Sequence, residues 1–418
     1  KGLSGEGYEG HYFWDTEMYM LPVFIWTNPD VARELLLFRY NTLPQARERA
    51  KVLGHPNGAL YPWRTINGNE ASTYFPLGTA QYHINGDIAY AVWQYFEATG
   101  DYDFLRDFGA EMLIETARVF ADVGCFAEGR NGKYCICSVT GPDEYNAIVD
   151  NNLYTNMLAQ ENLYSALRAL DILGEDAKRL DVTDSERESW KHIADNMYIP
   201  YDESRGIYLQ DDGFLMRKPY DESKVPEEKR HLLYENYHPL FIFRQQMCKQ
   251  ADAIYALQLL SHRFAEEELR CNYEFYQSVT LHHSSLSTCV FGMLACRIGK
   301  TEEAFKYFSD SARMDLDDYH ENFYAGIHAA NMAGTWQTIV FGFAGMRRVA
   351  GELEFSPNLP SAWDGYSFSI QYRGAVVKVS VSAGEVAFHL VNDVPVTIYL
   401  YNKPISLNNK GDAIHEKI

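Results

Sequence analysis

Residues 30–54 read DVARELLLFRYNTLPQARERAKVLG. Their apolar residues recur at helical spacing, and the stretch stops at Gly54, because glycine commonly follows the last turn of a helix. The same pattern, an apolar-periodic run that often closes on a glycine, recurs along the chain and predicts a series of helices in pairs. Further helices are predicted within residues 86–101, 107–124, 154–174, 249–260, 284–299 and 335–348. Such a succession predicts a mainly α fold, either a ring of paired helices (an α/α toroid) or a solenoid.

The pattern changes after Gly351. Residues 366–403 read YSFSIQYRGAVVKVSVSAGEVAFHLVNDVPVTIYLYNK, in which apolar and polar residues alternate and Val, Tyr and Phe are frequent. A period of two predicts short antiparallel strands, with turns at the Arg-Gly, Ala-Gly and Asn-Asp pairs. Because so few strands are not stable alone, we expect them to pack on the helices. The predicted organisation is a helical domain over 1–350 and a small antiparallel β domain, or a remnant of one, over 351–418.

The composition excludes several classes of partner. The chain of 418 residues has 37 basic and 57 acidic side chains, a formal net charge of -20. Since nucleic acids and anionic membranes bind through Lys and Arg, we expect neither as a partner. No signal peptide is recognisable, and no apolar run is long enough to span a bilayer. The cysteines are odd in number and form no CxxC pair, so we expect reduced thiols in a cytoplasmic protein.

Chemically reactive side chains gather in the loops between the predicted helices. A toroid brings such loops together at one mouth. They contain acids, a lysine, histidines, serines and tryptophans, a mixture that suits a sugar, because charged groups bind hydroxyls and an indole covers the ring. The loops span residues 10–17, 58–70, 140–146, 249–252 together with 280–287, and 326–336.

The loop TGPDEYN, residues 140–146, places Asp143 and Glu144 side by side. One interpretation is that both acids merely lie at the start of a helix, where negative charge is favourable. The other is that Glu144 supplies the proton for cleavage of a glycosidic bond. Asp143 then either helps to keep that proton in place or turns away to cap the following turn.

Together, in this order, the five loops resemble those of glycoside hydrolase family 65, whose members include inverting α-glucoside phosphorylases. The resemblance extends from Gly7 to about Gly345 and implies an (α/α)6 barrel as the catalytic domain. In that family a large β-sandwich domain precedes the barrel and a small β domain follows it, and we expect these residues to contain no counterpart of the sandwich. The resemblance also implies that Glu144 is the general acid.

The resemblance indicates phosphate rather than water as the nucleophile. Hydrolytic members have a glutamate base in the region that reads TLHHSSLS here, yet no Asp or Glu occurs from Gln277 to Leu286. Ser284 and Ser285 precede an apolar helix and, with His328, are expected to bind inorganic phosphate. The alternatives without a ligand are that the two serines cap the helix and that His328 is an interior histidine whose hydrogen bonds are all made within the protein. The adjacent His282 and His283 lack the further ligands of a metal site, so we expect no metal and no organic cofactor.

The remaining candidates are sugar ligands. The resemblance implies that Trp14, Asp15, Lys249 and Gln250 hold the non-reducing glucose. Trp63 and Glu70 are expected on the acceptor side, in a loop that is closer to kojibiose- or nigerose-type sequences than to maltose or trehalose types. Gln277, where many members have glutamate, is expected near the sugar.

The implied reaction is phosphorolysis of an α-linked glucosyl disaccharide with inversion, giving β-glucose 1-phosphate and a free acceptor sugar. The expected partners are thus a disaccharide and phosphate, with a homodimer as the expected assembly. Two alternatives remain open: an inverting α-glucoside hydrolase of the same family, and a sugar-binding fragment without activity.

Overall fold

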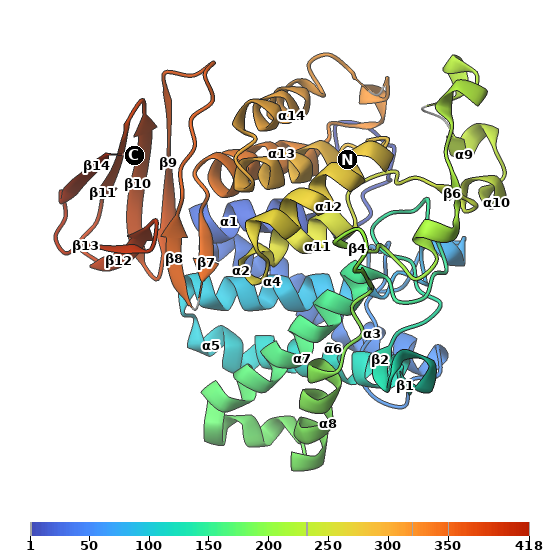
Figure 1. The fold of residues 1–418 in the computed structure, drawn as a ribbon. Coiled ribbons are helices and arrows are strands. Elements are labelled where there is room, and N and C mark those ends of the chain that lie inside the picture. Colours follow the sequence, from blue (N-terminus) through green and yellow to red (C-terminus); the bar gives the residue numbers. More distant parts are fainter. Residues whose placement is uncertain (1, 231–232, 320, 350, 418) are drawn as a thin grey trace.

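A computed structural model of the chain has helices from Thr16 to Phe343 and strands from Arg347 onward (Figure 1). In Figure 1 the strands of the C-terminal part stand at the left, beside the helical body. The predicted combination of a helical fold with a small β unit at its end is therefore confirmed. The structure describes residues 2–230, 233–319, 321–349 and 351–417.

Buried helices form a closed circuit in the middle of the molecule. They are α1 (Leu21–Thr27), α4 (His83–Thr99), α7 (Leu153–Leu173), α11 (Ala253–Leu259), α13 (Ser287–Arg297) and α15 (Ala329–Gln337). Each packs on the next in this order, and α15 packs on α1. These helices are surrounded by protein. For example, α13 is buried from Ser287 to Cys296, because its sequence is apolar on most sides and such a helix is stable only in the interior.

A second set of helices packs around this circuit. They are α2 (Pro29–Asn41), α3 (Leu43–Val52), α6 (Ala110–Val123), α8 (Asp184–Asp195), α12 (Glu266–Val279) and α14 (Thr301–Arg313). α2 contacts α1 and α4, α6 contacts α4 and α7, and α14 contacts α13 and α15. The predicted glycine stops are observed at Gly100, which is left-handed with φ of 71°, and at Gly174.

Two predicted helices differ from the observed ones. Residues 30–54 form α2 and α3 rather than one helix, because Pro44 in the first turn of α3 lacks the N–H and the backbone freedom to continue α2. The helix predicted over 335–348 begins earlier, at Ala329, so that most of the loop predicted over 326–336 is helical. It ends at Phe343, after a π-helical turn, and Gly345 has a φ of 58°. Arg347 and Arg348 belong instead to a strand.

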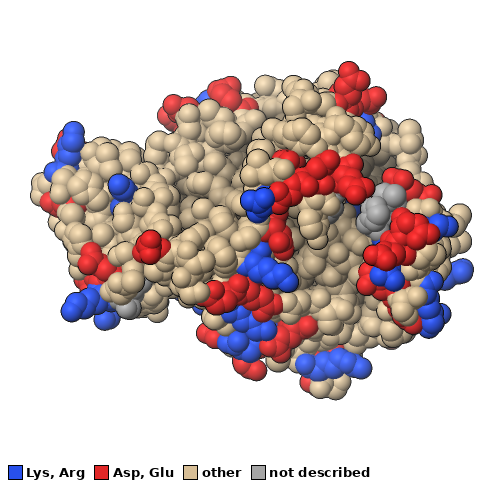
Figure 2. All heavy atoms as spheres, turned by 90° about the horizontal axis from the view of Figure 1, so that it is seen from above, with Lys and Arg blue, Asp and Glu red and all other residues tan. Residues whose placement is uncertain are grey.

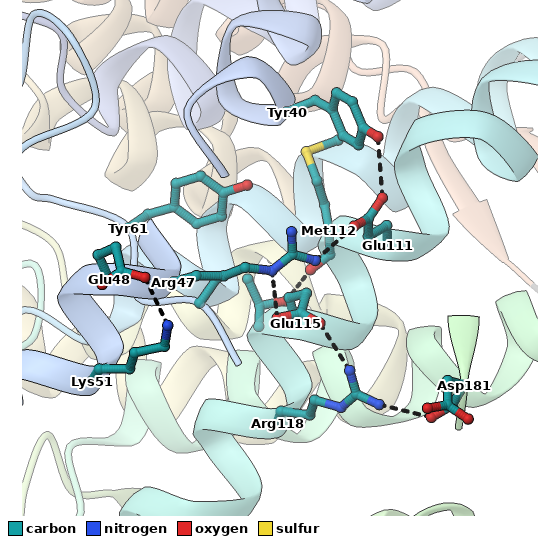
Figure 3. A network of polar contacts seen from close by, with 12 residues as sticks. Tyr40, Arg47, Glu48, Lys51, Tyr61, Glu111, Met112, Glu115, Arg118 and Asp181 are labelled. Carbon is teal, nitrogen blue, oxygen red and sulfur yellow. Dashed lines mark hydrogen bonds and ion pairs between the residues drawn. The ribbon is translucent and has the colours of Figure 1, made fainter. Parts of the chain in front are cut away.

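An ion-pair network fastens α3 to α6 (Figure 3). Nη2 of Arg47 lies 2.6 Å from Oε1 of Glu111, and its Nε lies 3.1 Å from Oε2 of Glu115. Glu115 also accepts a hydrogen bond from Arg118, and Glu111 accepts one from Tyr40. Because the network joins side chains from α2, α3 and α6, it fixes these outer helices relative to one another.

The C-terminal strands form two four-stranded sheets. One has the order β14-β11-β10-β9 and the other β13-β12-β8-β7. The pairs are antiparallel as predicted, except that β12 pairs with β8 in parallel. β9 packs on α1 and α4, where Tyr372 stacks on Trp26, so the strands do rest on the helices as expected. The bounds are β7 (Arg347–Val349), β8 (Glu352–Phe355), β9 (Gly365–Tyr372), β10 (Ala375–Ser382), β11 (Glu385–Leu390), β12 (Val396–Leu400), β13 (Lys403–Leu407) and β14 (Ala413–Lys417).

The shorter elements lie in the connections. They are the helices α5 (Tyr102–Phe104), α9 (Leu233–Asn236) and α10 (Pro239–Ile242), and the strands β1 (Cys125–Ala127), β2 (Lys133–Cys135), β3 (Tyr201–Asp202), β4 (Ile207–Tyr208), β5 (Lys218–Pro219) and β6 (Gln245–Gln246). Every cysteine is a free thiol, as predicted. On the face in Figure 2, Lys and Arg side chains lie beside runs of Asp and Glu rather than in a separate basic patch. None of the described helices has the length and hydrophobicity needed to cross a membrane.

Candidate active site

A cavity of about 340 Å³ lies where the helices of the inner circuit begin. All five loops singled out in the sequence contribute to its wall, although they are far apart along the chain. We call it the Glu144 cavity. It is lined by Tyr8, Phe13, Trp14, Asp15, Trp63, Glu144, Lys249, Gln250, His283, Ser284, Ser285, Leu286, Asn322, His328 and Ala330.

Glu144 and Lys249 form an ion pair in the wall of this cavity. The Lys249 Nζ lies 2.6 Å from Oε2 of Glu144, and the two side chains are 23% and 20% exposed. Burial lowers the pKa of Lys249, but the Glu144 carboxylate outweighs this effect, so that the pKa is raised. The Tyr234 hydroxyl donates to the Glu144 carbonyl and holds its backbone from the other side. Glu144 is therefore positioned through both its side chain and its main chain.

Asp143 points away from the cavity into the protein. Its Oδ1 accepts hydrogen bonds from the backbone N–H of Lys249 at 2.7 Å and of Tyr145 at 3.2 Å. Its Oδ2 accepts from the side-chain amides of Asn146 and Gln210. Burial raises the pKa of Asp143, and the four donors only partly counter this effect. Asp143 therefore turns away from the cavity and caps the following turn, which was the second of the two alternatives.

Close packing behind Glu144 explains the glycine of its loop. A Cβ atom on Gly141 would lie 2.3 Å from Oδ2 of Asp252, which itself accepts a hydrogen bond from the Asp143 N–H. Burial and the nearby Asp143 raise the pKa of Asp252 well above its ordinary value. The loop is thus seated directly on a buried carboxyl group, and only glycine allows this approach.

Trp14 and Asp15 enter the cavity just before the first inner helix. Trp14 is buried and packs edge-on against Tyr19 and His83, with ring centroids 5.6 Å and 5.1 Å away. Burial and, secondarily, the charge of Glu144 raise the pKa of Asp15 to about 6. Asp15 is consequently a hydrogen-bond acceptor whose charge changes close to neutral pH.

Trp63 and Glu70 belong to one loop but have different surroundings. Trp63 lines the cavity and packs edge-on against Phe13. Glu70 lies behind it, where its carboxylate accepts hydrogen bonds from the backbone N–H groups of Trp63 and Arg64 and pairs with Arg49 at 3.1 Å. Glu70 thus braces the loop that presents the indole.

Serines and a histidine also line the cavity. Ser284 and Ser285 precede α13, and the Ser284 hydroxyl accepts a hydrogen bond from the Leu286 N–H at 3.3 Å. Asp315 accepts from the backbone N–H of His328 at 2.9 Å and contacts its Nδ1 at 2.6 Å. A carboxylate on Nδ1 fixes the orientation of the ring.

Some residues of interest lie elsewhere or were not anticipated. Gln277 donates to Glu303 and Tyr307, and with His282 it lines a different hollow between α12 and α14. Burial lowers the pKa of His282 to about 4. Sequence reasoning did not single out Tyr8, Phe13 or Asn322, although Tyr8 and Phe13 lie in an aromatic-rich stretch beside Trp14 that was a usable signal.

The chemistry available in the cavity follows from its charged groups. Among the described residues that line it, the carboxylates are Asp15 and Glu144, and the ammonium group is that of Lys249. The same wall offers the hydroxyl and imidazole groups of its serines and histidines. The arrangement therefore combines a carboxyl group that can transfer a proton with several hydrogen-bond donors that can hold an anion.

Comparisons with known proteins identify the family of the chain. The model for "Glycosyl hydrolase family 65 central catalytic domain" matches residues 1–337, and that for the family's C-terminal domain matches residues 346–407. An alpha,alpha-trehalose phosphorylase of Geobacillus stearothermophilus is 49% identical over 96% of this chain and 53% of its own length. A maltose phosphorylase of Bacillus subtilis is 38% identical over 98% of this chain and 54% of its own.

A solved structure has the same fold. It is described as a putative kojibiose phosphorylase from the human microbiome, has a TM-score of 0.91 and 30% sequence identity, and is matched over 100% of this chain and 55% of its own. The chain thus spans about half the length of the relatives that it matches. The two family models together cover nearly all of its residues. The chain belongs to glycosyl hydrolase family 65.

Proposed function

We propose that this chain carries the catalytic centre of an inverting phosphorylase, which cleaves an α-linked glucosyl disaccharide with inorganic phosphate. The observation that carries the proposal is that one cavity contains both a possible acid, Glu144, and a set of anion donors, Ser284, Ser285 and His328. Phosphate is already an anionic nucleophile and requires donors rather than a base. The trehalose, maltose and kojibiose phosphorylases among the relatives support the same reaction class.

In the proposed reaction the non-reducing glucose lies between Trp14 and Asp15 on one side and Lys249 and Gln250 on the other. Glu144 donates its proton to the glycosidic oxygen, and the bond from that oxygen to the anomeric carbon breaks. A phosphate oxygen attacks the same carbon from the opposite face. The products are β-glucose 1-phosphate and an acceptor sugar that carries the transferred proton.

The ion pair with Lys249 gives this step a physical requirement. In the ligand-free cavity the Oε2 atom of Glu144 is engaged by the Lys249 ammonium group, whereas proton donation requires that this carboxyl group contacts the glycosidic oxygen. Glucose hydroxyls that bind Lys249 would replace Glu144 as its hydrogen-bond partner. Substrate binding is therefore expected to release the Glu144 carboxyl group for its role in the reaction.

Hydrolysis is the second candidate, because Asp15 is a further carboxylate in the cavity. The test is a steady-state assay with and without phosphate. Phosphorolysis predicts that sugar phosphate forms at a rate that saturates with phosphate. Glucose release without phosphate would instead support the hydrolase, and no turnover with intact sugar binding would support the inactive fragment.

The identity of the acceptor sugar is a separate proposal. The sequence-based preference for a kojibiose- or nigerose-type substrate remains a prediction. Two trehalose phosphorylases are 48% and 49% identical to this chain, whereas a kojibiose phosphorylase is 38% identical. We therefore place α,α-trehalose first among the substrates to test, followed by kojibiose, nigerose and maltose, each as initial velocities at equal concentration.

We also infer that the circuit of inner helices, with its surrounding helices, is an (α/α)6 barrel that ends near residue 350. The order of contacts from α1 through α15 and back supports this architecture. The predicted homodimer and cytoplasmic location remain predictions. Size-exclusion chromatography with light scattering tests the dimer directly.

The proton-donor role of Glu144 has its own test. Glu144→Gln keeps the shape of the side chain but has no transferable proton, so phosphorolysis of the disaccharide is expected to fall by about 10²- to 10⁴-fold. With α-glucosyl fluoride, whose leaving group needs no proton, the variant is expected to retain most of the wild-type rate. Equal losses with both substrates would contradict the assignment.

A further inference from the structure

A second cavity, of about 570 Å³, lies at the opposite end of the inner helices. The chain that enters α1 gives Asp15 to the Glu144 cavity, and the far end of α1 gives Trp26 to the second one. In the same way Gln250 precedes α11 and lines the first cavity, whereas Gln258 near its end lines the second. We call this second space the Arg348 cavity.

Aromatic side chains lie between the residues that line the two cavities. Trp14 packs against Tyr19 at 5.6 Å and against Tyr255 at 6.2 Å, and Tyr19 lies 5.4 Å from Tyr255. All three side chains are buried in the core. A ligand of the Arg348 cavity would thus be separated from the catalytic residues by this aromatic layer.

Aromatic side chains form part of the wall of the Arg348 cavity. Trp26 and Trp93 are buried at its edge, and Tyr90 and Phe341 complete the aromatic lining. The guanidinium of Arg168 covers the Trp93 ring at 4.8 Å. A wall that combines aromatic groups with planar charged groups suits a ring that has one apolar face and a polar edge, as a pyranose has.

The charges around the cavity are balanced. Its arginines are paired with carboxylates: Arg348 with Glu97, Arg347 with Glu354 at 3.1 Å, and Arg168 with Glu161 at 3.4 Å. Paired charges still offer hydrogen-bond donors and acceptors, but they provide little net attraction for an ion. The lining therefore favours a neutral polar ligand over a phosphorylated one.

Among the described wall residues, three buried side-chain atoms have no hydrogen-bond partner, and one of them, Oε1 of Glu161, forms an ion pair with Arg263. The other two are Nη1 of Arg348, a donor on a side chain that is 10% exposed, and Oε1 of Gln258, an acceptor. Leaving such atoms unpaired is unfavourable. A sugar hydroxyl can accept one hydrogen bond and donate another, so it matches the chemistry of both groups.

We propose that the Arg348 cavity is a second carbohydrate-binding site, which takes a neutral mono- or disaccharide. A volume of about 570 Å³ is within the range of small-molecule sites and accommodates a disaccharide with bound water. The inference does not depend on the reaction at Glu144, since it rests on different residues. Sugar bound in the Arg348 cavity would contact the same inner helices that carry the active site, so the concentration of free sugar would act on these helices.

The proposal is tested by isothermal titration with glucose and with α,α-trehalose. Lys249→Met weakens sugar binding in the Glu144 cavity. In this variant we expect one saturable sugar site per chain, the Arg348 cavity. Arg168→Met and Gln258→Leu each remove a polar group of the Arg348 cavity and are expected to weaken that binding by about threefold to tenfold, the range for one hydrogen bond. Arg187→Met, on the outer helix α8, is the matched control and should leave it unchanged.

Several results would overturn the proposal. The first is that Lys249→Met shows no saturable binding up to about 100 mM sugar. The second is that sugar still binds when Arg168→Met and Gln258→Leu are combined. The third is that inorganic phosphate binds to this cavity as tightly as sugar does. Circular dichroism and thermal melting confirm that each variant is folded. Ala91→Phe, which fills the space from α4, is a further variant and is expected to abolish the binding while phosphate-dependent turnover persists.

Discussion

The ion pair between Lys249 and Glu144 permits a quantitative test of how the candidate acid is held. Its N–O distance is 2.6 Å, and about four fifths of each side chain is buried. Removing one partner leaves a partly buried charge with no counter-ion. For hydrogen bonds to charged groups this loss is about 2 kcal/mol.

The corresponding change in melting temperature follows from the size of the chain. Unfolding entropy of about 2.1 cal/mol/K per residue, over 418 residues, is about 0.9 kcal/mol/K. Lys249→Met and Glu144→Gln are therefore each expected to lower the Tm by about 2 °C. The double variant is also expected to lose about 2 °C rather than about 4 °C, because the second substitution removes the charge that the first left unpaired.

Differential scanning calorimetry of the four proteins measures this double-mutant cycle. The pKa of Lys249 is raised in the folded state, so the stabilisation is present below the lysine pKa of the unfolded chain, about 10.4, and is lost as the pH rises through the folded pKa. The exposed pair of Lys51 and Glu48, substituted in the same way, is the control and should show no coupling. Additive losses at Lys249 and Glu144 at neutral pH would refute the reasoning.

Other predictions concern the neighbours of Glu144. Since the pKa of Asp15 is about 6, its protonation should raise the KM for the disaccharide about tenfold between pH 7 and pH 5, and Asp15→Asn should remove this pH dependence. Because that pKa is raised by folding, ionised Asp15 destabilises the protein, and Asp15→Asn should increase the Tm at pH 7 by up to about 3 °C. Asp143→Asn should lower kcat by about 10- to 100-fold with little effect on KM, since it loosens the backbone of Glu144 and Lys249 together; an unchanged kcat argues against this positioning role. Glu70→Gln should raise KM by about threefold, because it weakens the bracing of Trp63, and kcat should be retained.

Local patterns predicted most of the fold. Apolar periodicity located the inner helices α4, α7, α11 and α13, and glycines marked the ends of α4 and α7. It missed α1, which is short, and α15, most of which lies in a stretch predicted as a loop. The errors have local causes too. At Pro44 the rigid ring outweighed the helical pattern of residues 30–54, and beyond Gly345 the polar pair Arg347-Arg348 was assigned to a helix because it followed an apolar one. The parallel pairing of β12 with β8 depends on the path of the chain between them, which alternation of residues does not reveal.

Prediction of the site was limited in a different way. The motifs identified Glu144 and Lys249 separately, but 105 positions separate them, and only the fold reveals their ion pair. The same holds for Asp315, which orients His328 from the preceding loop. Gln277 illustrates the opposite difficulty: its place in sequence is close to the serines, yet the turn of α12 directs its side chain towards Glu303. Sequence proximity does not define which side of a helix faces the cavity.

The direction of the inner helices connects the architecture to the proposed chemistry. Asp15, Lys249, Ser285 and His328 each stand shortly before an inner helix, so the cavity collects the N-terminal ends of α1, α11, α13 and α15. Helix N-termini have a partial positive charge and backbone N–H groups without an intrahelical acceptor. Several of them around one space favour an anion such as the proposed phosphate, although the whole chain has a net charge of -20. At Asp15 the effect of burial is larger, because its pKa is raised to about 6, so the helix ends suit a ligand anion better than they suit this buried carboxylate.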